Sequence, residues 1–228
     1  MRHLFTIMIT LSILSGQKAL QSNSIFKNKI GIDAGLFANY GNSGFETDGF
    51  FEVQTRGGLF VETYGMTQWN LNSTIINTSV GIINEFSSNV TFGGGYSNYF
   101  EINNGILHEL FIGASSNLIA GAVYVGLSSD FPINYFGLVN LNELFTTFFD
   151  ATITTTMSNE LNQLGFDIFL NLSKTFESGI TAGYILSSER YEDKEEVNFS
   201  KGGYSKNYII PVVSQGLFNT IFIGWNFN

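Results

Sequence analysis

Residues 29–40 read KIGIDAGLFANY, and this stretch decides the fold because its two alternate sets of positions differ in character. The even positions are apolar and the odd positions are mostly polar or small: Ile30, Ile32, Ala34, Leu36, Ala38 and Tyr40 against Gly31, Asp33, Gly35, Phe37 and Asn39. A period of two residues is that of a β-strand with two different faces. The last residues repeat the pattern, with one apolar set made of Ile221, Ile223, Trp225 and Phe227.

The same alternation predicts twelve strands, near residues 29–40, 48–56, 58–67, 74–86, 89–98, 106–116, 118–128, 133–141, 145–157, 162–174, 178–189 and 217–227. Their lengths cluster around the roughly 9–11 residues that a tilted strand needs to cross a bilayer, and exceed the roughly 5–6 residues of soluble strands. A count of 10–14 strands is compatible with the pattern, because residues 208–213 suit either an extension of the last strand or a separate hairpin strand.

The predicted connections alternate in length along the chain. Tight turns alternate with longer loops such as 41–47, as in outer-membrane barrels, where short turns face the periplasm and long loops face outward. The longest connection, 190–216, also has the densest charge and is expected to be a solvated extracellular loop.

Strands with one lipid-facing side require a closed sheet, because each unpaired backbone group in hydrocarbon costs several kcal/mol. The sequence therefore predicts an all-β fold, a closed antiparallel up-and-down transmembrane β-barrel. The second face of each strand then lines the interior, and the predicted lumen-lining charges are Asp33, Glu52, Arg56, Glu62, Glu109, Asp150 and Asp167. A soluble β-sandwich is the alternative, but its exposed face would need more Lys and Glu than the Gly and Thr present here.

Composition agrees with a membrane barrel. Hydrophobic residues make up 44% of the 228 residues and charged residues 13%, about half of the roughly 25% of an ordinary soluble domain. The net charge of −9 disfavours nucleic acid as a partner, since phosphates attract Lys and Arg. Cysteine is absent, which excludes disulfides, thiolate metal sites and cysteine nucleophiles.

The first twenty residues have the form of a secretory signal peptide. Arg2 and His3 precede an apolar run over residues 4–14, and small and polar residues follow. That run is shorter than the roughly 20 residues of a membrane-spanning helix, and a buried N-terminal helix is the alternative interpretation. Residues 1–20 are therefore predicted to be removed on export, and residues 21–228 to form one barrel. Export without cysteine favours a bacterial envelope.

Aromatic residues near strand ends are typical of the girdles at the two membrane interfaces. The candidates are Tyr40, Tyr64, Trp69, Tyr96, Tyr99, Tyr124, Tyr135, Tyr184, Trp225 and Phe227.

The C-terminal segment 221–228, IFIGWNFN, resembles the closing strand of bacterial outer-membrane proteins. In that class, alternating apolar residues lead to a terminal aromatic residue that the barrel-assembly machinery reads. Ile221, Ile223, Trp225 and Phe227 match it, although Phe227 is here penultimate. Segments 57–65 and 93–99 resemble hairpins of the TorF-type putative porins, which are similar in length. Membership would imply a small porin in the outer membrane, surrounded by its lipid.

No motif for chemistry emerges from the mature chain. Its one histidine, His108, shares its side of the strand with Ile106 and Leu110, whereas the neighbouring Glu109 points to the other side. A base and its orienting carboxylate on opposite faces cannot form a catalytic dyad. We therefore expect no enzyme, no metal site and no cofactor.

Two interpretations of the interior remain open. In the first, the acidic residues line a small, cation-preferring channel for small solutes or ions, with space left by inward glycines such as Gly35, Gly95 and Gly183. In the second, inward phenylalanines such as Phe37 and Phe148 fill a closed structural or adhesive barrel that presents its outer loops to partners. The sequence specifies neither the solute nor the oligomeric state.

Overall fold

The structure is a computed structural model that describes residues 30–42, 44–69, 73–87, 89–102, 105–127, 133–145, 148–160, 163–201 and 204–227. For residues 99, 101, 105, 107, 158–160, 163–164, 191–201 and 204–213 it describes the backbone alone. Its elements are β1 (Gly31–Gly41), β2 (Gly44–Gln54), β3 (Leu59–Gln68), β4 (Ser73–Ser87), β5 (Val90–Glu101), β6 (Gly105–Ser116), β7 (Ile119–Gly126), β8 (Ile133–Asn140), the 3-10 helix η1 (Leu141–Glu143), β9 (Asp150–Glu160), β10 (Gln163–Thr175), β11 (Ile180–Lys201) and β12 (Tyr204–Phe227). The predicted signal peptide, residues 1–20, lies outside the described residues.

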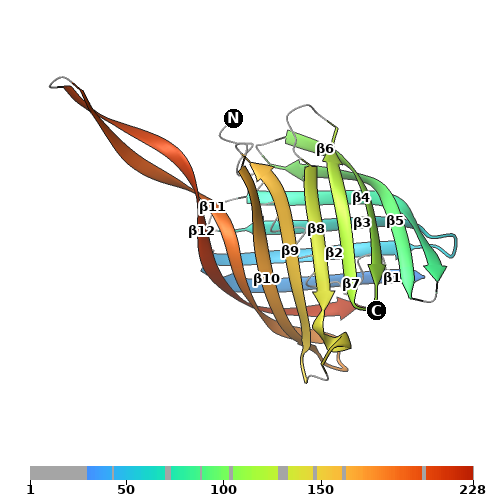
Figure 1. Cartoon of the computed structure of the whole chain (residues 1–228). Helices are drawn as coiled ribbons and strands as arrows, with labels where there is room; N and C mark the ends of the chain where they lie inside the picture. Colours follow the sequence, from blue (N-terminus) through green and yellow to red (C-terminus); the bar gives the residue numbers. More distant parts are fainter. Residues whose placement is uncertain are drawn as a thin grey trace.

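The twelve strands form a closed barrel in which each strand pairs antiparallel with its sequence neighbours, and β1 pairs with β12. This confirms the predicted fold class and strand number. In Figure 1 strands β1–β4 run across β7–β10 on the facing wall, as expected for strands that tilt strongly relative to the barrel axis. No helix among the described residues is long and apolar enough to cross a membrane.

The outer surface of the barrel is apolar. Exposed large side chains follow the period of two along the strands, for example Ile32 and Leu36 on β1 and Ile221 and Ile223 on β12. A continuous apolar surface on all sides is unfavourable in water and typical of a barrel surrounded by lipid.

The inner surface combines polar rows with two apolar clusters. One cluster lines the wall from β10 through β12 and β1 to β4, and the other lines β3 to β8: Phe37, Phe50, Tyr64, Met66, Ile75, Phe169, Ile185 and Phe222, and Phe60, Ile83, Phe111, Ala122 and Phe136. Tyr64 and Tyr124 belong to this interior, so they are not part of an interfacial girdle. Tyr40, Trp69 and Trp225 are exposed, as interfacial aromatics should be.

Inward glycines make room for these aromatic rings rather than for an open lumen. A Cβ built on Gly183 would lie 2.4 Å from the Phe222 ring, and one built on Gly95 would lie 2.2 Å from the carbonyl oxygen of Val80 and 2.9 Å from the Phe111 ring. The Phe222 and Phe111 rings therefore lie so close to these glycines that a side chain at either position would collide with its neighbours.

Three predicted boundaries were wrong. Residues 44–47 belong to β2 rather than to a loop, β9 begins at Asp150 rather than at residue 145, and the tight turn expected at 142–143 is the longer connection 141–149 that contains η1. Polar residues such as Glu46 resemble a loop in sequence, but they continue a strand here because the barrel interior accepts polar side chains. The predicted alternation of short turns and long loops is not observed. The connection at 42–43 is short, although a long loop was expected there, and the long connection 141–149 lies at the opposite end of the barrel, where tight turns were expected.

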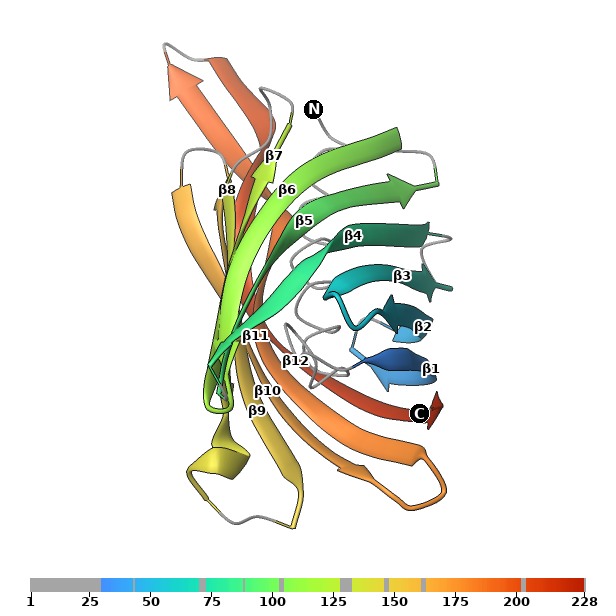
Figure 2. The ribbon, with the colours of Figure 1, turned by 90° about the vertical axis from the view of Figure 1, so that its right-hand side faces the viewer.

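The predicted loop 190–216 is also wrong, because β11 and β12 continue through it as a hairpin. The pairing of β11 with β10 ends at Ile168 and Ser188, and that of β12 with β1 ends at Gly41 and Thr220, but β11 and β12 stay paired up to Lys201 and Tyr204. This ribbon projects from one end of the barrel, and η1 lies at the other end (Figures 1 and 2). Charge alone indicated a loop, yet backbone pairing of two strands in water does not depend on an apolar face.

The close fit at Gly95 predicts a strong effect of adding one methyl group. Gly95→Ala is expected to destabilise the barrel by about 1–3 kcal/mol, since overpacking forces backbone and ring shifts. Gly65→Ala is the matched control: its Cβ would have no neighbour closer than 3.9 Å, so we expect a change near zero. The measurement is the urea concentration at which half of the refolded barrel is unfolded, and heat-modifiable migration in gels reports the folded fraction. Equal midpoints for the two variants would contradict the packing described here.

Candidate functional site: the acidic interior

Hydrogen-bonded register aligns a row of acidic and hydroxyl side chains across the inside of β1 to β6. We call this set the acidic row, and each member lies directly opposite the next: Asp33, Glu52, Glu62, Ser79, Ser97 and Glu109. The Oγ atoms of Ser79 and Ser97 lie 2.6 Å apart, and Asn134 Nδ2 donates to Glu109 Oε1 over 3.4 Å. Four of the seven predicted lumen-lining residues are thus brought into one continuous row.

The acidic row runs from one end of the barrel towards the other. Asp33 is near the start of β1, at the end of the barrel that also holds η1, whereas Glu109 is near the start of β6, at the end from which the hairpin projects. Strand tilt causes this rise, because a row perpendicular to tilted strands climbs along the barrel axis. Glu62 and Glu109 are buried, and Asp33 and Glu52 are half-buried. The row therefore offers successive carboxylates along the length of the interior.

A second acidic group, which the sequence analysis missed, lies on β2. Glu46 and Asp48 are 3% and 4% exposed and project inward beside Asn39, Tyr64 and Gln68. Gln68 Nε2 donates to Glu46 Oε1 over 2.8 Å, and Asn39 Nδ2 donates to Asp48 Oδ2 over 2.9 Å. The signal was present: Asp48 lies within the predicted strand 48–56 with the same parity as Glu52, and extending that strand by two residues would have included Glu46.

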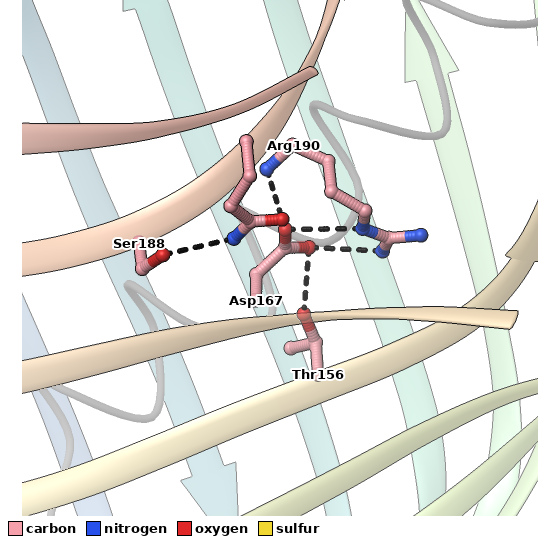
Figure 3. Close-up of polar contacts among 5 residues, drawn as sticks. Thr156, Asp167, Ser188 and Arg190 are labelled. Carbon is pink, nitrogen blue, oxygen red and sulfur yellow. Dashed lines mark hydrogen bonds and ion pairs between the residues drawn. The ribbon is translucent and has the colours of Figure 1, made fainter. Parts of the chain in front are cut away.

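Asp167 forms a buried ion pair at the point where the hairpin leaves the wall (Figure 3). Its carboxylate accepts the backbone N–H of Arg190 at 2.7 Å, and the guanidinium donates from Nε at 3.2 Å and from Nη2 at 3.0 Å. Thr156 Oγ1 adds a donor at 3.3 Å. Because pairing between β10 and β11 ends two residues earlier, Asp167 takes over a backbone donor that the sheet no longer satisfies. Arg190 also occupies the space beside Gly165.

Two predicted lumen residues occupy different positions. Arg56 is exposed in the turn that follows β2 and therefore does not belong to the barrel wall. Asp150 is half-buried at the first residue of β9, where Asn142 Nδ2 donates to Oδ1 over 2.8 Å, so it holds η1 at the barrel rim. Phe148 is exposed outside the strands, so it does not fill the interior either.

His108 is exposed on the outer face of β6 and hydrogen-bonds through Nδ1 to the hydroxyl of Tyr96. Glu109 is buried on the inner face. The two side chains lie on opposite sides of the wall, a geometry without a shared reacting position.

Negative charge dominates the described interior. The buried charged side chains are five carboxylates and one guanidinium: Glu46, Asp48, Glu62, Glu109, Asp167 and Arg190. The guanidinium is paired with Asp167, which leaves an excess of acidic over basic groups among these buried side chains.

No family model matches the chain, and no curated protein matches it either. Solved porin structures do resemble it: the NanC porin at 12% identity and TM-score 0.57, and the KdgM porin at 9% identity and TM-score 0.54, each covering 86% of this chain and 99% of the porin chain. Outer membrane protein Omp33 of Acinetobacter baumannii matches at 10% identity and TM-score 0.50, over 88% of this chain and 99% of its own. The KdgM porin is also solved in complex with disordered oligogalacturonate. At these identities the likeness establishes a shared barrel fold.

The Asp167 pair predicts that one substitution loosens the base of the hairpin. Asp167→Asn leaves the buried guanidinium without its carboxylate, and breaking a buried pair costs about 3–5 kcal/mol. Hydrogen exchange, measured by mass spectrometry, should show faster exchange over residues 189–201. Thr156→Val is the milder comparison, because it removes one hydroxyl donor to the carboxylate, worth about 1.5–3 kcal/mol, and leaves the guanidinium paired with Asp167. The role of Asp167 would be refuted by similar protection in the two variants.

Proposed function

We propose that this protein is a channel of the bacterial outer membrane that passes small solutes and prefers cations. The acidic row carries the proposal, because it extends through the interior of a closed barrel whose outer face is apolar. Carboxylates spaced along a passage attract cations without holding any of them in one deep site, which suits conduction. The fold shared with porins supports the same conclusion.

Localisation follows from the same surfaces. Outer-membrane lipid would cover the apolar face, and residues 1–20 would act as the export signal. Ile221, Ile223, Trp225 and Phe227 are exposed along the outer face of the closing strand, where the barrel-assembly machinery would read them during insertion. The projecting hairpin would face outward.

The negative charge of the interior argues against oligogalacturonate as a solute of this channel. Each galacturonate unit carries a carboxylate, and five buried carboxylates against one paired guanidinium repel such a chain. The proposed solutes are therefore small cations or neutral polar molecules, although a porin of the same fold has been solved with oligogalacturonate.

A closed barrel is the second candidate. The two apolar clusters and the rings that lie against inward glycines favour it, since they place large apolar side chains in the interior. Such a barrel would act through the hairpin of β11 and β12, which it would present to a partner outside the cell.

Single-channel recording in a planar bilayer under a salt gradient tests the first candidate. We expect small, cation-selective steps. One carboxylate near a passing cation contributes about 1 kcal/mol at high dielectric, so Glu62→Gln and Glu109→Gln should each lower the cation-to-anion permeability ratio about fivefold.

Arg56→Gln and Glu177→Gln are controls, because both side chains are exposed in turns outside the interior. They should leave the reversal potential unchanged. A folded, heat-modifiable barrel without any conductance would reject the channel and favour the closed barrel.

A further inference from the structure

The acidic group on β2 contains a carboxylate that only a neutral group contacts. Glu46 lies between Asn39 on β1 and Gln68 on β3 in direct register. Within the described part of the chain its hydrogen-bond donor is the Gln68 amide at 2.8 Å, and no basic side chain forms an ion pair with it. A buried charge that lacks a counter-charge is costly, so this position favours a cation from outside the chain.

Asn39 provides an independent observation on the adjacent strand. Its amide nitrogen must face Asp48, because a carboxylate only accepts hydrogen bonds. The amide oxygen Oδ1 is therefore oriented as an acceptor, and it is buried and has no donor among the described residues. Asn39 itself is 2% exposed. A buried carbonyl oxygen without a donor is rare and calls for a ligand or a water molecule.

Asp48 completes an oxygen-rich set. It projects inward two residues after Glu46, and Tyr64 hydroxyl donates to its Oδ2 over 3.4 Å. The amide and hydroxyl donors of Asn39, Gln68 and Tyr64 fix the orientation of the two carboxylates. Hard oxygen atoms of this kind are the ligands that alkali metal ions prefer.

We propose that Asn39, Glu46 and Asp48 form a binding site for one small monovalent cation such as K⁺, which deepens the channel function and rests on it. The described residues contain no group of three or more His, Cys, Asp or Glu side chains able to hold a metal ion together, so a tight divalent site is not built here. Glu46 is near the first residue of β2, at the hairpin end of the barrel, where an entering cation would reach it before the middle of the acidic row. Weak binding near a mouth followed by further carboxylates is what conduction requires.

The test measures binding separately from conduction. The refolded full barrel in detergent is unfolded by heat at rising K⁺ concentration, with N-methylglucamine replacing K⁺ so that ionic strength stays constant. Ligand that binds the folded state alone raises the midpoint in a saturable way. We expect such a rise for the wild type and no rise in a control titration that exchanges N-methylglucamine for choline.

Glu46→Gln and Asp48→Asn preserve shape and remove one charge each, and should raise the half-saturating K⁺ concentration at least about fivefold, as loss of about 1 kcal/mol of binding would. Glu177→Gln, the same change in an exposed turn, should leave it unaltered. Heat-modifiable migration shows that each variant is folded, so loss of fold and loss of binding are distinguished.

Two outcomes overturn the site: a wild-type midpoint that does not depend on K⁺, or an unchanged half-saturation in both Glu46→Gln and Asp48→Asn. Cation-selective conductance together with either outcome would reject this site and leave the channel intact. Saturable K⁺ binding in a barrel that does not conduct would support the site and reject the channel.

Discussion

Closure of the sheet is the constraint on which the rest of the structure depends. A strand whose outer face is surrounded by hydrocarbon cannot leave backbone groups unpaired, and here β1 meets β12 over Ala34 to Gly41. Closure reverses the distribution of a soluble domain, since apolar side chains lie outside and polar ones lie inside. Where the wall ends, the constraint ends too: beyond Ser188, β11 needs only β12 as a partner, and Asp167 satisfies the first backbone donor that β10 no longer pairs.

The interior of the barrel must then be packed without the continuous apolar core of a soluble domain. Rings from Phe37, Phe111 and Phe222 lie over glycines on adjacent strands, so large and small residues alternate across the wall. This arrangement places apolar clusters beside the polar rows inside the barrel. Among the described interior side chains, the buried charged groups are therefore a few carboxylates and one guanidinium beside packed aromatic rings.

Sequence periodicity was sufficient for the barrel and for the twelve strands, because alternation of apolar and polar residues directly reflects a wall between lipid and interior. It also placed Glu62, Glu109 and Asp167 on the inner face, where they are buried. It failed at Glu46 and at 190–216, since polar composition indicates a loop in water but is compatible with a strand inside a barrel or in a hairpin. Register was not accessible: the opposition of Asp33, Glu52 and Glu62 depends on turn lengths that differ from the predicted ones.

The register of the strands places acidic residues that are far apart in the sequence in one row, and this row runs along the barrel axis. Three carboxylates directly opposite one another on adjacent strands repel at a separation of about 5 Å, so such a row carries a cost in stability. A cation close to the row would lower that repulsion. The buried guanidinium among the described residues is paired with Asp167 on β10. Among the described residues, the buried base thus anchors the hairpin through Asp167, while the carboxylates of β1 to β3 give that part of the interior its negative sign.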